Sequence, residues 1–251
     1  MKLINLKNKA IASDYVAIKL LKLIQDNPKA ILGLATGNTM TDIYPRFSEL
    51  LEANDTDLSQ VQTFNLDEYV GLEPEHSQSY HSYMHQLLFD YNDGWQSSHI
   101  HIPQGKAKDL EAEAKRYEEH LKSIGDPDIQ LLGIGENGHI GFNEPGTSFE
   151  SETRVVDLTD STIKANSVHF DKIEDVPKQA VSMGLKSIMR AKCIVLIAFG
   201  ERKQEAIRRL LEEETTEDLP ASILHKHPNV EIIIDDTIYN YFKKIGQDAK
   251  I

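Results

Sequence analysis

The sequence predicts an α/β domain in which helices cover both faces of a mostly parallel β-sheet. The first observation is that strand-like and helix-like segments alternate along the chain, because strands joined through helices pair in parallel. The second is that 251 residues, 40% of them hydrophobic, suit one domain with a substantial core. No repeat, low-complexity tract or linker divides the chain. We therefore expect a single domain over residues 1–251.

The first half of the chain predicts two helices and two strands. Residues 10–24 carry apolar side chains at helical spacing. Residues 30–37 (AILGLATG) predict a short buried strand that runs into a glycine turn. A second helix is expected to begin near Thr39, and Pro45 must lie in its first turn or kink it. Residues 61–72 (VQTFNLDEYVGL) then predict a strand with a polar end.

The second half continues the alternation. A helix is expected over residues 111–125, ending at a glycine, and a strand follows over residues 129–135. Further on we expect a strand over residues 193–200, a helix over residues 201–214 and a strand over residues 230–235. Ligands of such sheets bind beyond the carboxyl ends of the strands, so functional residues should lie there.

Charge and composition limit the classes of partner. A net charge of -13 argues against a broad nucleic-acid or anionic-membrane surface, although a small phosphate ligand needs only local N–H groups and a cation or two. The single Cys193 can form no internal disulfide, and its apolar surroundings predict a buried strand cysteine. We see no signal peptide, and no apolar run approaches the ~20 residues of a membrane span. A cytoplasmic location is therefore expected.

A first chemically suggestive stretch is GLATGNTMT, which follows a predicted strand. Gly37 allows unusual backbone angles, and Asn38 and Thr39 add side-chain donors beside the N–H groups of the coming helix. This arrangement could hold a phosphate, or it could be a plain turn with Thr39 as the helix N-cap. The stretch lacks the lysine of a P-loop, so nucleoside triphosphate binding is not indicated.

A second stretch, FNLDEYVGL, places two consecutive carboxylates, Asp67 and Glu68, at the end of a strand. A carboxylate that projects into the ligand crevice can serve as a general base when it is partly buried. The alternative is a helix cap or an acid on a surface turn.

The third stretch is GIGENGHIGFNEPG, residues 133–146, which holds five of the chain's 14 glycines. Its first six residues match the G-x-G-x-x-G pattern of a dinucleotide site, but that site needs a helix to open within the motif. The following glycines and proline make a poor helix, so we interpret the match as accidental. What remains is a glycine-rich loop that displays a histidine suited to general acid/base chemistry, although a lone loop histidine is usually a surface or packing residue. The polar residues of this loop are Glu136, Asn137, His139, Asn143 and Glu144.

One further residue suggests an anion site, and four histidines raise the question of a metal. Lys203 stands near the start of a predicted helix, where a cation gains nothing from the helix dipole, so either an anionic ligand or solvent should face it.

The histidine pairs at positions 81 and 85 and at 99 and 101 lack the H-E-x-x-H pattern and a compact carboxylate set. We predict no metal site.

Taken together and in this order, ATGNT, FNLDEYVGL and GENGHIGFNEPG closely resemble the glucosamine-6-phosphate deaminase family. The likeness extends from about Ile31 to Ile234 and includes ANS at residues 165–167 and VPKQAVSMG at residues 176–184. The related 6-phosphogluconolactonases share the fold and the glycine loop, but typically not the F-N-E-P continuation. The resemblance implies a modified doubly wound, Rossmann-like sheet. It also implies conversion of glucosamine 6-phosphate and water to fructose 6-phosphate and ammonia without a cofactor.

Roles for single residues follow from the resemblance only. Asp67 matches the base that moves a proton between C2 and C1, His139 the histidine that assists ring opening, and Glu144 its supporting carboxylate. Asn137, beside the histidine, completes the catalytic set. The substrate-binding set consists of Gly37, Asn38, Thr39, Gly135 and Lys203.

The chain departs from the best-known members of the family in three places. Asn137 replaces an Asp; its amide oxygen could hold the His139 ring but lacks the charge that stabilises imidazolium. Val168 replaces an Arg that contacts phosphate in larger members, so His169 or another cation would have to substitute. Arg154 keeps one allosteric cation, but Val156 replaces a Lys. We predict no strong activation by N-acetylglucosamine 6-phosphate, and a monomer or small homo-oligomer.

Two other functions remain open at this stage. A hydrolase similar to 6-phosphogluconolactonases would open a lactone and release no ammonia. A sugar-phosphate sensor of a transcription regulator would need a helix-turn-helix, and the ~30 residues before the first predicted strand are too few for one. The preferred partner is therefore a small phosphorylated amino sugar, with no nucleic acid and no membrane.

Overall fold

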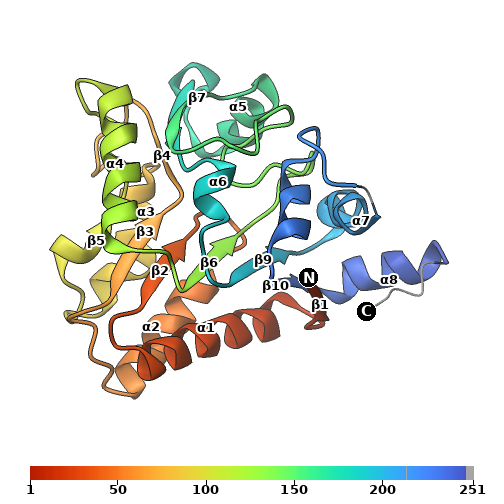
Figure 1. The fold of residues 1–251 in the computed structure, drawn as a ribbon, viewed down its shortest axis with the longest axis horizontal. Coiled ribbons are helices and arrows are strands. Elements are labelled where there is room, and N and C mark those ends of the chain that lie inside the picture. The colour runs from red at the N-terminus through yellow and green to blue at the C-terminus, as the bar shows by residue number, and fades with distance from the viewer. Residues whose placement is uncertain (213, 247–251) are drawn as a thin grey trace.

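The computed structural model describes residues 1–212 and 214–246, without the side chains of Ala165 and His169. Its main feature is a seven-stranded parallel sheet with the order β1-β10-β9-β6-β2-β3-β5 (Figure 1). The strands are β1 (Lys2–Asn5), β2 (Ile31–Leu34), β3 (Gln62–Asn65), β5 (Ile100–His101), β6 (Ile129–Leu132), β9 (Ile194–Ala198) and β10 (Val230–Ile234). Every residue of β6 and β9 is buried, as expected for parallel strands covered on both faces.

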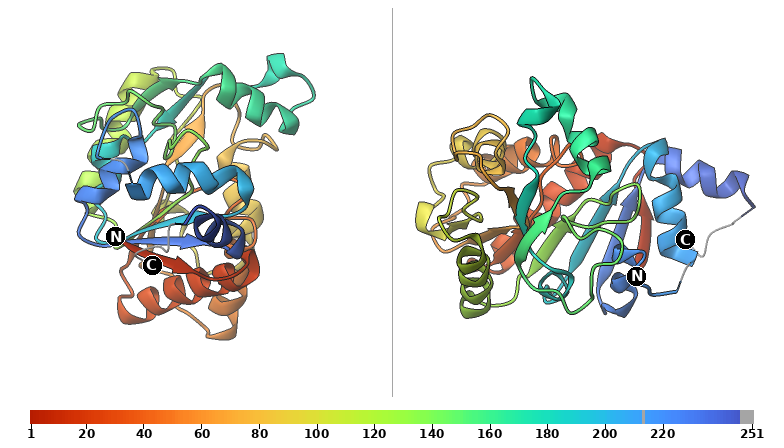
Figure 2. Two further views of the ribbon diagram at one scale, coloured as in Figure 1. Left: turned by 90° about the vertical axis from the view of Figure 1, so that its right-hand side faces the viewer. Right: turned by 90° about the horizontal axis from the view of Figure 1, so that it is seen from above.

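Helices and a second, smaller sheet enclose the parallel sheet. The α-helices are α1 (Lys9–Asp26), α2 (Ile43–Ala53), α3 (Tyr80–Leu87), α4 (Leu110–Ile124), α5 (Asp160–Asn166), α6 (Leu185–Ile188), α7 (Gln204–Glu212) and α8 (Asp236–Lys244). The smaller sheet is antiparallel, with the order β4 (Asp67–Tyr69), β8 (Gln179–Ser182) and β7 (Arg154–Asp157). Seen from the side, α1 and α2 cover one face of the parallel sheet, and α4 and the small sheet lie beyond the other (Figure 2).

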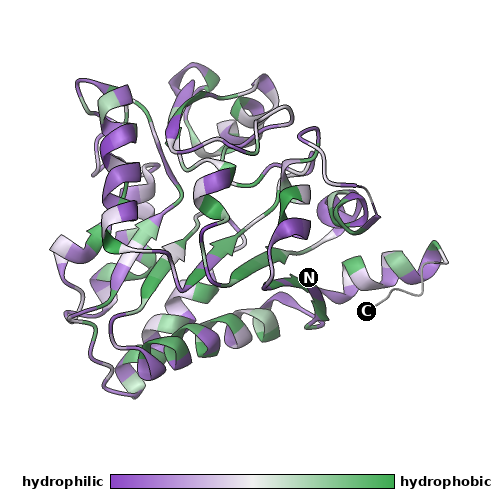
Figure 3. Ribbon diagram, in the orientation of Figure 1, coloured by the Kyte–Doolittle hydropathy of each residue, from purple (hydrophilic) through white to green (hydrophobic). Residues whose placement is uncertain are grey.

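The 3₁₀ helices connect these elements. They are η1 (Phe89–Tyr91), η2 (Ser97–His99), η3 (Ser167–His169), η4 (Ile173–Asp175), η5 (Glu201–Lys203) and η6 (Pro220–Lys226). Colouring by hydropathy shows apolar residues concentrated in the central strands and α1 banded between apolar and polar residues (Figure 3). Within the part of the chain that the structure describes, no helix has the length and apolarity needed to cross a membrane.

The strand order creates a crevice between β2 and β6. From β2 the chain proceeds outward to β3 and β5, and it then returns to β6 on the opposite side of β2. The connections that leave the carboxyl ends of β2 and β6 therefore diverge, and the space between them is the usual ligand site of such folds. The fold class predicted from the sequence is confirmed.

Several details differ from the predictions. The first strand is β1 at Lys2–Asn5, not the segment near residue 30. The second helix begins at Ile43, so Thr39 is not its N-cap, and Pro45 lies in its first turn. Residues 61–72 do not form one strand, because the chain passes from β3 into β4 of the other sheet at Leu66.

Two predictions about the second half also need correction. Cys193 precedes β9 and is only partly buried. The helix expected over residues 201–214 begins as η5 and continues as α7 to Glu212, while residue 213 lies outside the described part of the chain.

Candidate active site

A pocket of about 930 Å³ occupies the crevice at the carboxyl ends of β2, β3, β6 and β9. Loops that follow these strands supply most of its wall, and β4, α3 with the residues before it, and α5 supply the rest. The pocket brings together eight of the nine predicted site residues: Gly37, Asn38, Thr39, Asp67, Gly135, Asn137, His139 and Lys203. The ninth, Glu144, lies behind His139. Residues from distant parts of the sequence therefore meet at one place.

The turn after β2 lines the pocket with residues whose backbone N–H groups are unpaired among the described residues. Gly37 has a φ of +96°, a conformation that favours glycine. The Asn38 carbonyl accepts hydrogen bonds from Lys9 Nζ and Thr41 Oγ1, at 2.9 Å each, which fixes the turn. Among the described residues, the N–H groups of Asn38 and Thr39 have no protein acceptor. They are free to donate to an anion.

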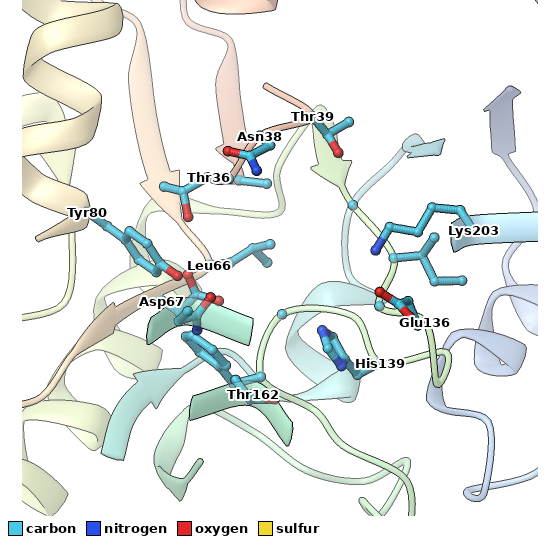
Figure 4. A pocket seen from close by; sticks show the side chains of 18 of the residues that line it. Thr36, Asn38, Thr39, Leu66, Asp67, Tyr80, Glu136, His139, Thr162 and Lys203 are labelled. Atoms are coloured by element: carbon cyan, nitrogen blue, oxygen red, sulfur yellow. The ribbon is translucent and has the colours of Figure 1, made fainter. Parts of the chain in front are cut away.

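Lys203 adds a cation to the same end of the pocket. It is the last residue of η5, and its side chain extends into the pocket from the side opposite Asp67 and Tyr80 (Figure 4). Burial lowers the pKa of Lys203, while the nearby carboxylate of Glu136 opposes this effect. Within the described chain, no acceptor lies within hydrogen-bond or ion-pair distance of its ammonium group. A partly desolvated, unpaired ammonium beside free N–H groups suits a phosphate.

The carboxylates of Asp67 and Glu68 have different surroundings because successive strand residues point to opposite faces. Glu68 accepts backbone N–H bonds from Tyr69, Tyr80 and His81 at 2.8–2.9 Å, so it supports the start of α3. Asp67 lines the pocket and is only 6% exposed. The capping role that the sequence left open thus falls to Glu68, and the pocket carboxylate is Asp67.

The environment of Asp67 tunes its proton affinity. Burial, with a smaller contribution from the neighbouring Glu68 carboxylate, raises the pKa of Asp67 to about 8. A carboxyl group with a pKa near neutrality can both accept and return a proton during one reaction cycle. Asp67 is therefore suited to move a proton between two carbon atoms of a ligand.

The glycine-rich stretch is a loop, and no helix opens within residues 133–146. A Cβ atom on Gly135 would lie 2.3–2.5 Å from three atoms of the His139 ring, so the ring packs directly on the backbone there. Gly141 has a φ of +57°, and a Cβ on it would lie 3.6 Å from Asp67 Oδ2. The glycines thus let the loop run close to both His139 and Asp67.

Glu144 is held as an ionised acceptor behind His139. Its Oε1 accepts a 2.7 Å bond from Thr162 Oγ1 and lies 3.5 Å from His139 Nδ1, and its Oε2 accepts a 2.7 Å bond from Asn137 Nδ2. Burial alone would raise the pKa of Glu144, but the contacts with His139, Thr162 and Asn137 outweigh it and lower the pKa to about 2. A carboxylate can only accept. His139 Nδ1 lies near Glu144 Oε1 but makes no hydrogen bond of good geometry to it among the described residues. A proton on Nδ1 would face Glu144, and Nε2 would then be left to exchange a proton with a ligand.

The role of Asn137 differs from the one predicted. Its amide oxygen accepts the backbone N–H of His139 at 3.2 Å, not a ring N–H, and its amide nitrogen donates to Glu144. The reason is geometric, because the Asn137 amide is already shared between the loop backbone and the carboxylate. Asn137 therefore orients Glu144, and Glu144 is the residue that lies next to the His139 ring.

Some pocket residues were not found from the sequence. Thr162 comes from α5, and Tyr80 and Phe142 stack at 6.3 Å and 12° to form an apolar wall. Only the fold brings these side chains to the pocket, so no local motif signals them. Val168 is 77% exposed on η3, and the side chain of His169 lies outside the described residues, so the proposed substitute for the missing Arg is not placed.

No three His, Cys, Asp or Glu side chains within residues 1–212 and 214–246 are arranged to hold a metal ion.

Comparison with known proteins shows which family the chain resembles. The family model described as glucosamine-6-phosphate isomerases/6-phosphogluconolactonase matches residues 8–233. This chain belongs to that family.

Individual members of the glucosamine-6-phosphate isomerase/6-phosphogluconolactonase family are similar over nearly the whole chain. A protein of Staphylococcus haemolyticus named glucosamine-6-phosphate deaminase is 78% identical over 240 residues, which cover 96% of this chain and 99% of the relative. The solved structure of a monomeric glucosamine-6-phosphate deaminase has a TM-score of 0.93 and 44% identity, covering 96% of this chain and 99% of that one. A 6-phosphogluconolactonase from Trypanosoma cruzi has a TM-score of 0.78 and 19% identity, covering 95% of this chain and 96% of that one. At this low identity, the similarity shows only that the two proteins share a fold.

Proposed function

We propose that this protein is a glucosamine-6-phosphate deaminase, which converts glucosamine 6-phosphate and water to fructose 6-phosphate and ammonia. The observation that carries the proposal is that Asp67 and the His139–Glu144 pair face one pocket that also has an anion-binding end. An aldose-to-ketose conversion needs these three functions: a phosphate anchor, a group for the ring oxygen and a carbon base. The similarity to deaminases over nearly the whole chain supports the same choice.

The phosphate sets the position of the substrate. We place it at the N–H groups of the turn after β2 and at Lys203. Charge-assisted hydrogen bonds of this kind fix one end of the sugar, so that its reacting carbons meet the residues at the other end. The substrate-binding roles of Gly37, Asn38, Thr39, Gly135 and Lys203 form part of this proposal.

Ring opening is assigned to His139. Its Nδ1 lies 3.5 Å from Glu144, and we assign Nε2 to the substrate, so that the ring takes the proton of the C1 hydroxyl and delivers a proton to the ring oxygen. The C1–O5 bond breaks and C1 becomes an aldehyde. The ionised Glu144 stabilises the imidazolium form that arises between the two transfers. Asn137 keeps Glu144 in place throughout.

Asp67 then carries out the carbon chemistry. It removes the proton from C2 while the C1 oxygen takes a proton from the 2-ammonium group of the substrate, which gives an enolamine. It then returns a proton to C1, which leaves C1 as CH2OH and turns C2 into an iminium carbon. Water adds to that carbon and ammonia leaves, so the atoms of one water molecule balance the loss. The pKa of about 8 permits both directions of transfer near neutral pH.

A coupled assay for fructose 6-phosphate and ammonia tests the proposal. Wild type should release one ammonia for each fructose 6-phosphate formed, and Asp67→Asn should lower kcat by about 10²–10⁴-fold. Asp57→Asn, at an exposed surface position, is the matched control and should retain activity. Absence of ammonia release by wild type would refute the deaminase, and hydrolysis of 6-phosphogluconolactone instead would assign the lactonase reaction. Near-normal turnover of Asp67→Asn would refute its role as the base.

The organisation of the protein completes the proposal. We infer a single catalytic domain over residues 1–251 in the cytoplasm that works as a monomer or small homo-oligomer, without nucleic acid, membrane or cofactor. Arg154 donates a 2.9 Å bond to Asn143 Oδ1, so it already supports the glycine-rich loop. Sedimentation velocity should give a small assembly, and N-acetylglucosamine 6-phosphate should not strongly raise the rate. A hexamer with steep activation would contradict this organisation.

A further inference from the structure

The carboxylate of Glu144 is shared between two segments of the chain. Asn137 and His139 approach it from the glycine-rich loop, whereas Thr162 reaches it from α5. The Thr162 hydroxyl and the His139 ring contact the same oxygen, Oε1, at 2.7 and 3.5 Å. The position of the oxygen that faces the histidine therefore depends on a residue outside the glycine-rich loop.

Proton counting fixes the direction of the hydrogen bond between Thr162 and Glu144. The ionised Glu144 can only accept, so Thr162 Oγ1 must donate its single proton to it. Thr159 Oγ1 lies 3.0 Å from this oxygen, 2.9 Å from Ser161 Oγ and 3.4 Å from Glu144 Oε1, and its one proton can serve only one of them at a time. Of the two threonine hydroxyls, that of Thr162 therefore makes the closer contact with the carboxylate.

Helix capping does not account for Thr162. The N-cap of α5 is Thr159, whose side-chain oxygen accepts the backbone N–H of Thr162. The hydroxyl of Thr162 takes no part in that cap, and the residue is only 8% exposed at the pocket wall. A buried hydroxyl needs a partner, and Glu144 is the acceptor to which it donates.

We propose that Thr162 is a positioning residue for ring opening, whose hydroxyl holds Glu144 Oε1 toward His139 Nδ1. This inference rests on the deaminase proposed above. Without the hydroxyl, Glu144 keeps its bond from Asn137 and a long 3.4 Å contact from Thr159 Oγ1 to Oε1. A contact of that length holds Oε1 only weakly, so the oxygen can rotate away from the histidine. The substrate contacts at the phosphate end are untouched, so turnover is affected more than substrate binding.

Two Thr162 variants and a matched control test this proposal. Thr162→Val keeps the shape but removes the donor, and Thr162→Ser keeps the donor. Thr63→Val is the control, because Thr63 is fully buried in β3 outside the pocket and its Oγ1 has no hydrogen-bond partner among the described residues. Thr162→Ala serves as a second donor-free variant if valine overpacks the site, and thermal unfolding verifies that each variant is folded.

The decisive readout is the titration of the Glu144 carboxyl group, followed by ¹³C NMR and assigned by comparison with Glu144→Gln. Loss of one hydrogen bond should move its midpoint upward by about one pH unit in Thr162→Val, and serine should restore it. In the same variant kcat should fall about tenfold with KM changed less than about twofold, whereas Thr63→Val should match wild type.

Two results would overturn the proposal. One is a Glu144 midpoint that is the same in folded Thr162→Val or Thr162→Ala as in wild type. The other is a serine variant that folds but has the valine variant's low kcat. The titration requires no substrate, so a failure of the deaminase proposal has a separate signature, namely a wild type that releases no ammonia.

Discussion

Asn137 links Glu144 to the backbone of His139: its amide nitrogen donates to Glu144 Oε2 at 2.7 Å, and its amide oxygen accepts the His139 N–H at 3.2 Å. The amide uses its donor on one partner and its acceptor on the other. A carboxylate at this position has two acceptors and no donor, so it cannot make both contacts. The identity of residue 137 therefore affects the supporting carboxylate before it affects the histidine.

Asn137→Asp should shift the pH–rate profile. The new carboxylate would lie against Glu144 Oε2, and the loss of a donor together with like-charge repulsion raises the pKa of Glu144 from about 2. The acid limb of kcat should therefore move to higher pH by about one unit or more. Rates measured from about pH 2 upward, over the range in which both proteins stay folded, will detect this shift. A profile that overlays that of wild type would mean that the two side chains do not interact.

A double variant provides the control for this change. Asn137→Asp combined with Glu144→Gln exchanges the amide and the carboxylate, so one donor again meets one acceptor. The free energy of unfolding should recover toward the wild-type value. Activity should stay low, because no carboxylate then faces His139 Nδ1. Recovery of activity in the double variant would show that the location of the charge is unimportant.

Burial of Asp67 predicts a pH-dependent stability. The pKa of Asp67 is about 8 in the folded protein against an ordinary 3.8, so the folded state binds more protons than the unfolded state between these values. The stability contributed by this group is present at low pH and declines as the pH rises through that window. Relative to Asp67→Asn, wild type should lose at most about 1.4 kcal/mol per pH unit. Urea unfolding at about pH 5, 6.5 and 8 measures it, and a constant difference would contradict a buried, protonated Asp67.

The pKa of Glu144 is lowered by folding, whereas that of Asp67 is raised, so Glu144 provides an internal check on this measurement. Its pKa is about 2 in the folded protein against an ordinary 4.5, so its contribution is present above pH 4.5 and is lost as the pH falls toward 2. This window overlaps the one for Asp67 only between pH 3.8 and pH 4.5. Glu144→Gln should therefore leave the slope of stability with pH unchanged between about pH 5 and 8.

The sequence predicted the parts of the fold that repeat a local pattern. The parallel strands β2, β6, β9 and β10 are apolar runs, and α1 and α4 have clear helical spacing, so each was placed to within a few residues. The strand ends then indicated where Asp67, His139 and Lys203 would meet. The small antiparallel sheet was missed, because β4 follows β3 after a single residue and its pairing with β8 joins residues more than a hundred positions apart.

The support around the site could not be predicted for a similar reason. Asp67 and Glu68 are neighbours in the sequence, which does not show which of the two faces the pocket. Only the orientation of β4 shows that Glu68 accepts hydrogen bonds from the start of α3 and that Asp67 lines the pocket. The bond from Thr162 to Glu144 depends on where α5 lies against the loop. Asn137 was expected to hold the His139 ring, but the direction of an amide depends on all its neighbours together.

Gly135→Ala should impair catalysis with little effect on folding. The added Cβ would lie 2.3–2.5 Å from atoms of the His139 ring, so the ring must move away from Glu144. Gly135 does not have a positive φ, so alanine is compatible with its backbone. We expect kcat to fall about 10²-fold and the unfolding temperature to change little. Gly133→Ala is the comparison, because its added Cβ would meet nothing closer than Thr39 Oγ1 at 4.0 Å. Equal losses in the two variants would refute the explanation based on the ring.

Lys203→Met should weaken binding of the phosphate end of the substrate. The methionine keeps much of the side-chain volume but removes the unpaired ammonium, which we expect to make a charge-assisted hydrogen bond. A bond of this kind corresponds to a rise in KM of about 10–100-fold. The effect on kcat should be smaller, because the residue lies away from the reacting carbons. Inhibition by inorganic phosphate, measured beside KM, reports the same site without turnover.

Arg202→Gln is the matched control for Lys203. The Arg202 side chain is 79% exposed and is paired with Glu136, so solvent screens its charge. Its replacement should change KM and phosphate inhibition by less than about threefold. The reverse order, with Arg202→Gln causing the larger loss of phosphate inhibition, would move the anion site from the buried end of the pocket to its rim. Arg202 would then be the cation that compensates for Val168.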